Sequence, residues 1–219
     1  MKGWLVFLVL LVILIAGCTT EQIIPEEEKE KSTPETGVEQ EQESGGEIMG
    51  NVLFIIAQNN FRDEELQKPK DILEKAGYEV KVASITTNTA TGMLGARVTP
   101  DLRVKDAKVE DYDLIVVVGG SGSPELAKHE EVLFLLREAS SENKKLGAIC
   151  LGPMVLAKAG VLEGKRATVY RTTESVNALE QGGASFVDDT VVVEEDLVTA
   201  NGPSASEVFG NELLKLLQK

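Results

Sequence analysis

Basic residues and cysteines are scarce in this sequence of 219 residues. The chain has 22 Lys and Arg against 36 Asp and Glu, which gives a formal net charge of −14. Because phosphate contacts need a basic face, this balance argues against nucleic acid as a partner. There are two cysteines, Cys18 and Cys150, and one histidine, His129. Since Cys18 lies in the N-terminal segment, we predict a folded body with one thiol and no internal disulfide.

The N-terminus has the composition of an export signal. Lys2 precedes an apolar run over residues 4–16, which ends in small residues and is short for a membrane span. The sequence Ile-Ala-Gly-Cys ending at Cys18 resembles a prokaryotic lipobox. That resemblance implies a lipoprotein signal peptide at residues 1–17 and a lipid on Cys18; a plain N-terminal membrane anchor is the alternative. In either case we expect tethering at the outer face of the cell membrane.

Residues 18–49 are predicted to be an acidic, disordered linker. The stretch 19–49 holds ten Glu against two Lys and almost no large apolar side chains. Such a segment cannot bury enough apolar surface to offset the entropy lost on ordering. We therefore place a single folded domain at residues 50–219.

Strand and helix patterns alternate through that domain. The run 112–118 is apolar apart from Asp113, as is typical of a strand buried on both faces. This alternation predicts an α/β fold, a flavodoxin-like three-layer α/β/α sandwich with a mostly parallel central sheet. The expected strands are 51–57, 78–85, 112–118, 144–149, 167–170, 190–196 and 197–200, and the expected helices are 65–77, 123–142, 152–160 and 204–217.

Three loops follow strands at the edge where ligands bind in such sheets. They are residues 58–65, 119–124 and 150–153. Because the carboxyl ends of parallel strands lie at one edge, we expect these loops to converge.

Cys150 lies between a buried strand and a helix start, which predicts a cysteine nucleophile elbow. A residue there is held on a tight, strained turn, and Gly152 leaves room for it. The helix N-terminus and nearby amide N–H groups are expected to lower the pKa of the thiol, which favours the reactive thiolate. The alternative is a buried, inert thiol.

The segment around this cysteine resembles the nucleophile region of the ThiJ/PfpI superfamily. Residues 148–153 carry A-I-C-x-G-P, and 159–164 carry A-G-x-L-x-G. Further matches are Glu65 four residues before a proline, the Gly-Gly pair at 119–120 and the Gly-Pro at 202–203. The resemblance covers residues 51–219. The superfamily includes PfpI-type cysteine peptidases and the parkinsonism-associated deglycase.

The resemblance implies a role for each matching residue. Cys150 is the nucleophile, and Glu65 is a buried, protonated acid bonded to its sulfur. The backbone N–H groups of Gly120 and Leu151 form an oxyanion hole. Tyr170 lies near the pocket. The alternatives are a solvated helix residue for Glu65 and a core aromatic for Tyr170. A homo-oligomer is expected by resemblance, and neither a cofactor nor a metal site is predicted.

The chain also departs from the superfamily pattern. PfpI-type peptidases carry histidine directly after the cysteine, where this chain has Leu151. Its one histidine, His129, is expected on a helix surface, so no Cys-His pair is predicted and peptidase activity is doubtful. Class I glutamine amidotransferases share the elbow but need a C-terminal histidine that this chain lacks.

Three functional hypotheses follow. The first is a thiol enzyme of glyoxalase or deglycase type, which acts on small reactive carbonyls or their protein adducts through a hemithioacetal at Cys150. The second is a PfpI-type cysteine peptidase or amidase. The third is a non-enzymatic redox sensor or holdase-type chaperone, in which the thiol oxidises to a sulfinic acid beside Glu65.

Overall fold

The computed structural model describes residues 48–219. The predicted signal peptide at residues 1–17, the lipid site Cys18 and the acidic linker up to residue 47 lie outside the described residues. Within residues 48–219, no helix is both long enough and apolar enough to cross a membrane.

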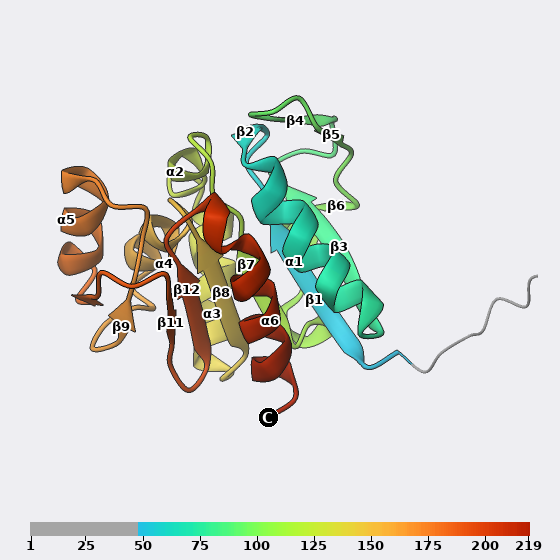
Figure 1. Cartoon of the computed structure of the whole chain (residues 1–219). Helices are drawn as coiled ribbons and strands as arrows, with labels where there is room; N and C mark the ends of the chain where they lie inside the picture. The colour runs from blue at the N-terminus through green and yellow to red at the C-terminus, as the bar shows by residue number, and fades with distance from the viewer. Residues whose placement is uncertain (1–47) are drawn as a thin grey trace, which may run out of the picture. The chain divides into compact units, whose positions relative to one another are not determined.

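A seven-stranded sheet forms the centre of the domain (Figure 1). Its strands lie in the order β11-β12-β8-β7-β1-β3-β6, and each neighbouring pair is parallel except β11 with β12. The predicted mostly parallel sheet is therefore confirmed. The strands are β1 (Gly50–Ile55), β3 (Tyr78–Ser84), β6 (Leu102–Arg103), β7 (Leu114–Val117), β8 (Lys145–Ile149), β11 (Val191–Val193) and β12 (Leu197–Ala200).

Helices cover both faces of this sheet. Helices α1 (Asp63–Lys75) and α6 (Ser206–Leu217) contact each other on one face, and α3 (Glu130–Ser141) and α4 (Pro153–Ala159) lie on the other (Figure 1). Because side chains alternate along a strand, β1 contributes side chains to both faces of the sheet. Val52 and Phe54 join the buried cluster beneath α1 and α6, whereas Leu53 and Ile55 join the cluster on the opposite face. The three-layer α/β/α sandwich is confirmed.

Smaller elements lie around the central sandwich. They are β2 (Asn59–Phe61), β4 (Ala90–Gly92) and β5 (Arg97–Val98) in one small sheet, β9 (Arg166–Ala167) and β10 (Ser185–Phe186) in another, the helices α2 (Ser123–Leu126) and α5 (Thr173–Gln181), and the 3-10 turns η1 (Val104–Asp106), η2 (Val109–Asp111) and η3 (Pro203–Ala205). Of the strand expected at 167–170, only Ala167 lies in a strand, β9.

The expected single helix at 123–142 is wrong, because the chain forms α2 and α3 with a break at Ala127–His129. His129 is the N-cap of α3 and has an extended backbone, with φ −103° and ψ 111°. Leu126 and Val132 are both buried. Six residues along a continuous helix turn through about 600°, so these side chains would point about 120° apart. The break allows both to enter the core.

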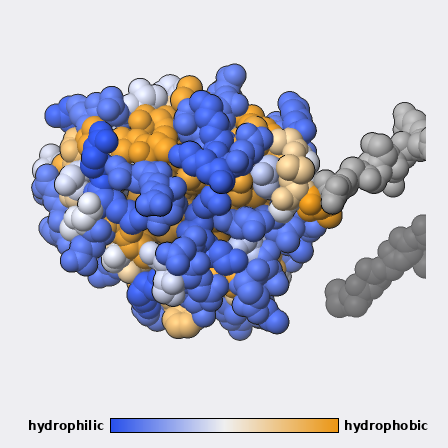
Figure 2. Space-filling view, turned by 90° about the horizontal axis from the view of Figure 1, so that it is seen from below, coloured by the Kyte–Doolittle hydropathy of each residue, from blue (hydrophilic) through white to orange (hydrophobic). Residues whose placement is uncertain are grey.

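The surface carries few large apolar side chains. Figure 2 shows one face, on which hydrophilic residues predominate and apolar residues gather in separate patches. The exposed large apolar residues of the described part of the chain are Ile48, Met49, Met93, Leu94, Phe134, Tyr170, Val193 and Val208.

Candidate active site

Cys150 occupies a strained turn between β8 and α4. Its φ is +60°, a left-handed conformation that few residues other than glycine adopt. Hydrogen bonds hold it from two sides: its N–H donates to the carbonyl of Ala200 (2.9 Å), and its carbonyl accepts the N–H of Tyr170 (2.8 Å). Backbone strain that neighbouring segments enforce in this way is typical of functional sites. The predicted elbow geometry is present.

Gly152 makes this turn possible by its lack of a side chain. Its N–H donates to the carbonyl of Ile149 at 2.9 Å and closes the turn. A Cβ at Gly152 would lie 2.5 Å from the carbonyl oxygen of Val117, a backbone atom of the neighbouring strand that cannot move aside. The predicted need for a small residue at this position is confirmed.

The three loops at the carboxyl edge of the sheet converge as predicted. Arg62 donates its N–H to the carbonyl of Gly119 (3.0 Å), and Gly122 donates to the carbonyl of Asn60 (3.1 Å). A Cβ at Gly119 would lie 2.3 Å from Oε2 of Glu65 and 2.4 Å from Cβ of Cys150. The Gly119 backbone therefore lies against both predicted site residues, and only glycine fits there.

Glu65 is completely buried, with 0% of its surface exposed. It lies in the first turn of α1, and neither carboxyl oxygen has a hydrogen-bond partner at normal distance among the described residues. A buried carboxylate without partners is costly, so the neutral acid is favoured. Burial raises the pKa of Glu65 to about 7, although the neighbouring sulfur of Cys150 and the positive charge of Arg62 lower it. A solvated position for Glu65 is excluded.

The expected low thiol pKa is wrong. Burial, and then the charge of Glu65, raise the pKa of Cys150 to about 12. The backbone N–H groups of Gly120 and Leu151 act in the opposite direction and lower this pKa, but they do not outweigh burial. Removing a proton from either acid opposes removing one from its neighbour, so the two titrate as a pair. When Glu65 holds its proton, the repulsion between its charge and a thiolate at Cys150 is absent.

The predicted oxyanion-hole residues, Gly120 and Leu151, each act on the Cys150 thiol through a backbone N–H. Both N–H groups lower the pKa of the thiol and so favour its negative charge. Gly120 has φ +105°, and a Cβ there would lie 2.3 Å from the carbonyl oxygen of Asn60. Glycine is therefore required where this N–H turns toward the site. The role of the Gly120 and Leu151 N–H groups in holding an oxyanion stays a prediction.

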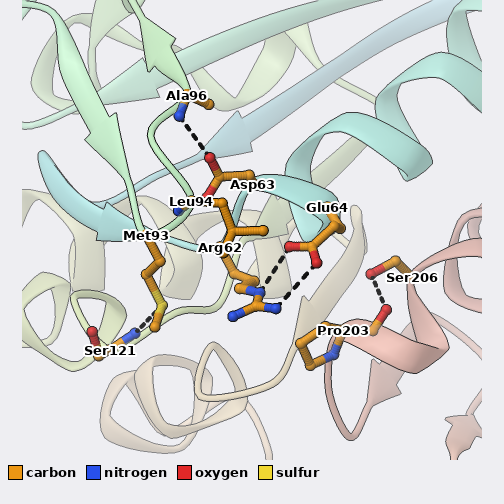
Figure 3. Close-up of polar contacts among 9 residues, drawn as sticks. All are labelled: Arg62, Asp63, Glu64, Met93, Leu94, Ala96, Ser121, Pro203 and Ser206. Carbon is orange, nitrogen blue, oxygen red and sulfur yellow. Dashed lines mark hydrogen bonds and ion pairs between the residues drawn. The ribbon is translucent and has the colours of Figure 1, made fainter.

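Sequence reasoning missed Arg62, the residue that precedes α1. Its guanidinium forms two hydrogen bonds with Glu64, from Nε at 2.8 Å and from Nη2 at 3.1 Å (Figure 3). Its charge also interacts with those of Glu65 and Cys150. The signal in the sequence is a single basic residue three positions before the predicted acid, at the start of the same helix.

A hairpin on the same edge of the sheet was also missed. Asp63 accepts hydrogen bonds from the N–H groups of Leu94 (2.8 Å) and Ala96 (2.7 Å), which lie between β4 and β5. The N–H of Ser121 contacts Sδ of Met93 at 3.4 Å (Figure 3). These contacts fix the hairpin against the loop that contains Gly119 and Gly120.

Comparison with known proteins identifies the family of this domain. The sequence pattern of the DJ-1/PfpI family matches residues 50–216. The chain belongs to the DJ-1/PfpI family.

Several members of the family resemble this chain closely. An uncharacterised protein of Methanocaldococcus jannaschii is 43% identical over 77% of this chain and 82% of its own length. A protein of Pyrococcus horikoshii named as a deglycase is 35% identical over 76% of this chain and 99% of its own. A glutathione-independent glyoxalase of Caenorhabditis elegans is 29% identical over 77% and 89%.

Solved structures of the family have the same fold. The crystal structure of a ThiJ/PfpI domain protein from Brachyspira murdochii superposes with a TM-score of 0.73 at 32% identity. The superposition covers 77% of this chain and 96% of that one. The flavodoxin-like α/β arrangement is thus shared with other DJ-1/PfpI proteins.

Two residues of this DJ-1/PfpI domain differ from the sequence expectations. The Tyr170 side chain is 50% exposed, so it is not a core aromatic; its ring lies against Gly202, where a Cβ would be 3.3 Å from the ring. His129 lies in the break before α3, with Nδ1 3.7 Å from Glu131. It lines a cleft of about 680 Å³ whose walls do not include Cys150 or Glu65. A pocket role for Tyr170 stays a prediction.

The raised pKa of Glu65 predicts a pH-dependent stability. In the folded state this pKa is about 7, above the ordinary value of 4.5. The stabilisation is present below the unfolded pKa and is lost as pH rises through about 7. Between pH 5 and pH 8, the free energy of unfolding of the wild type should fall by about 2 kcal/mol relative to that of Glu65→Gln.

Denaturant titrations at the two pH values measure this difference. Glu207→Gln is the matched control, because Glu207 is an exposed glutamate in the first turn of α6. It should follow the wild type at both pH values. If the free energy of unfolding changed equally with pH in the wild type and in Glu65→Gln, Glu65 would have an ordinary pKa in the folded protein.

Proposed function

We propose that this protein is a thiol-dependent enzyme of glyoxalase or deglycase type that acts on small reactive carbonyls or their protein adducts. The observation that carries the proposal is the buried pair of Cys150 and Glu65 at the elbow, against the Gly119 backbone. The relatives named as a deglycase and a glyoxalase support it. The pair supplies a nucleophile and a proton carrier without a histidine.

The first step is addition of the Cys150 thiol to an aldehyde carbon. The sulfur–carbon bond forms, the C=O double bond becomes single, and the thiol proton ends on that oxygen, which gives a hemithioacetal. The N–H groups of Gly120 and Leu151 stabilise the negative charge that develops during this addition. Glu65 serves as the proton carrier, because a pKa near 7 lets it both donate and accept at neutral pH.

A 2-oxoaldehyde can then be converted to a 2-hydroxy acid. The Glu65 carboxylate removes the hydrogen from the carbon bonded to sulfur and returns a proton to the neighbouring carbonyl carbon, while the hydroxyl proton of the hemithioacetal passes to the oxygen of that carbonyl. The product is a thioester on Cys150. Water hydrolyses this thioester, releases the 2-hydroxy acid and restores the thiol, so no external oxidant or reductant is consumed.

Methylglyoxal consumption and lactate formation test the proposal. We expect Cys150→Ala to abolish turnover, because the nucleophile is lost. Glu65→Gln should lower it by about 100-fold or more, since it removes the proton carrier but keeps the size of the side chain. The exposed Glu207→Gln variant should keep wild-type activity. A wild-type protein with an intact thiol that consumes no aldehyde would overturn the proposal.

Two further assays on the same proteins address the other hypotheses. Peptide hydrolysis that Cys150→Ala abolishes would favour the peptidase or amidase. If neither substrate reacts, the mass of the Cys150 peptide after peroxide treatment tests the redox sensor. A gain of two oxygen atoms at low peroxide would support a sulfinic acid and thus that hypothesis.

We also propose that the protein is tethered to the outer face of the cell membrane through a lipid on Cys18. The lipobox-like sequence that ends at Cys18 supports this location. A homo-oligomer is a further proposal, which rests on the family resemblance alone, and sedimentation velocity of the full chain measures it.

Substitution of Cys18 tests the lipid anchor. In a bacterium that processes lipoproteins, the full chain should incorporate labelled palmitate and sediment with membranes. Cys18→Ala should lose both the label and the membrane association. Cys150→Ala is the matched control and should keep both. A Cys18→Ala protein that stays in the membrane fraction would instead favour an N-terminal anchor helix.

A further inference from the structure

Arg62 places a positive charge at the edge of the Cys150 site. It precedes α1 and lies three residues before Glu65. Its N–H donates to the carbonyl of Gly119 at 3.0 Å, so its backbone is fixed to the loop that touches both Glu65 and Cys150. Its side chain is 26% exposed, which leaves the guanidinium accessible to a small solute.

Glu64 orients this guanidinium and leaves part of it free. Both carboxylate oxygens of Glu64 bind the same edge of Arg62, through Nε and Nη2. Nη1 has no acceptor among the residues that the structure describes, and it points away from Glu64 (Figure 3). A guanidinium is planar, and its N–H groups point in fixed directions. Two hydrogen bonds to Glu64 on one edge therefore fix the direction in which the remaining N–H groups point.

Two features beside the thiol favour an anion, although burial of the thiol opposes one. Glu65 is buried, has no partner for either oxygen among the described residues, and is most stable when neutral. In that state it adds no second negative charge beside Arg62, whose guanidinium is paired with Glu64 on one edge. The N–H groups of Gly120 and Leu151 also stabilise negative charge at the sulfur. The Arg62 guanidinium and the N–H groups of Gly120 and Leu151 therefore all favour negative charge near the Cys150 sulfur.

We propose that Arg62 recognises a carboxylate attached to the carbon that Cys150 attacks. The ligand that meets this condition is glyoxylate, an aldehyde whose carbonyl carbon bears the carboxylate; it forms the hemithioacetal with Cys150 but has no neighbouring ketone for the later isomerisation. The inference rests on the proposed function in taking Cys150 as the nucleophile. Arg62 binds the carboxylate through its free N–H groups, and Glu64 holds the guanidinium in place.

Two alkylating reagents of nearly equal size test this charge selection directly. Iodoacetate carries a carboxylate on the carbon that is attacked, whereas iodoacetamide carries a neutral amide there. With either reagent the Cys150 sulfur forms the new carbon bond, iodide leaves, and the thiol proton passes to solvent. The ratio of the two rates removes the effect of thiol pKa, because both reagents react with the same thiolate.

We expect Arg62→Met to lower the iodoacetate to iodoacetamide rate ratio about tenfold. Arg62→Lys, which keeps the charge, should stay within about threefold of the wild type. Arg103→Met is the matched control, because Arg103 forms the same two-bond pair with Asp106 at the β6 edge of the sheet. Its ratio should equal that of the wild type.

An unchanged ratio in Arg62→Met would overturn the proposal. If that variant does not fold, Arg62→Gln replaces it, and equal ratios for Arg62→Gln and Arg62→Lys would overturn it in the same way. Glyoxylate gives a second measurement, since a bound aldehyde slows iodoacetamide labelling. Protection by glyoxylate should need about tenfold more compound in the uncharged variant than in the wild type.

These results separate the inference from the proposed function. Alkylation ratios do not require turnover, so a protein that is inactive on methylglyoxal can still show charge selection at Cys150. That result would reject the proposed function and keep the anion site. The protein could also turn over methylglyoxal while the iodoacetate to iodoacetamide rate ratio is the same in Arg62→Met and the wild type. That result would keep the proposed function and reject the anion site.

Discussion

A carboxylic acid buried against a thiol governs the chemistry of this DJ-1/PfpI domain. Glu65 has no exposed surface, and Gly119 lies against both its carboxyl group and Cys150. Burial raises the pKa of both groups, and the charge of Glu65 raises that of Cys150 further. At mildly acidic pH Glu65 therefore retains a proton that an isolated carboxyl group in water would have lost. Reactivity depends on moving a proton of this pair at the right step.

The fold supplies that arrangement through the edge of a parallel sheet. β1, β7 and β8 are neighbours, and the loops that follow them meet where the strands end. Glycines at 119, 120 and 152 let backbones approach within distances that a side chain would prevent. Cys150 keeps its left-handed backbone because β12 and the segment at Tyr170 bind it from both sides. Arg62 then adds a charge whose direction Glu64 fixes.

The sheet and the elbow could be predicted from local patterns in the sequence, and the acid from the resemblance to the ThiJ/PfpI superfamily. Apolar runs marked the central strands, and the strand–cysteine–Gly-Pro order marked the turn. The sign of the thiol pKa shift could not be predicted, since it depends on burial and on Glu65, which is 85 positions away in the chain. The exposed ring of Tyr170 and the break before His129 likewise depend on tertiary packing. Helix α5 was missed although Thr172 and Ser175 form a capping box at its start.

Direct titration of the Glu65 carboxyl group tests the central claim, that this acid is neutral in the fold up to about neutral pH. The carboxyl carbon can be followed by NMR in protein labelled with ¹³C at glutamate, and its signal assigned by its absence in Glu65→Gln. The account predicts a midpoint near pH 7 for Glu65, well above the ordinary value of a glutamate carboxyl group. A midpoint at the ordinary value of 4.5 would contradict it.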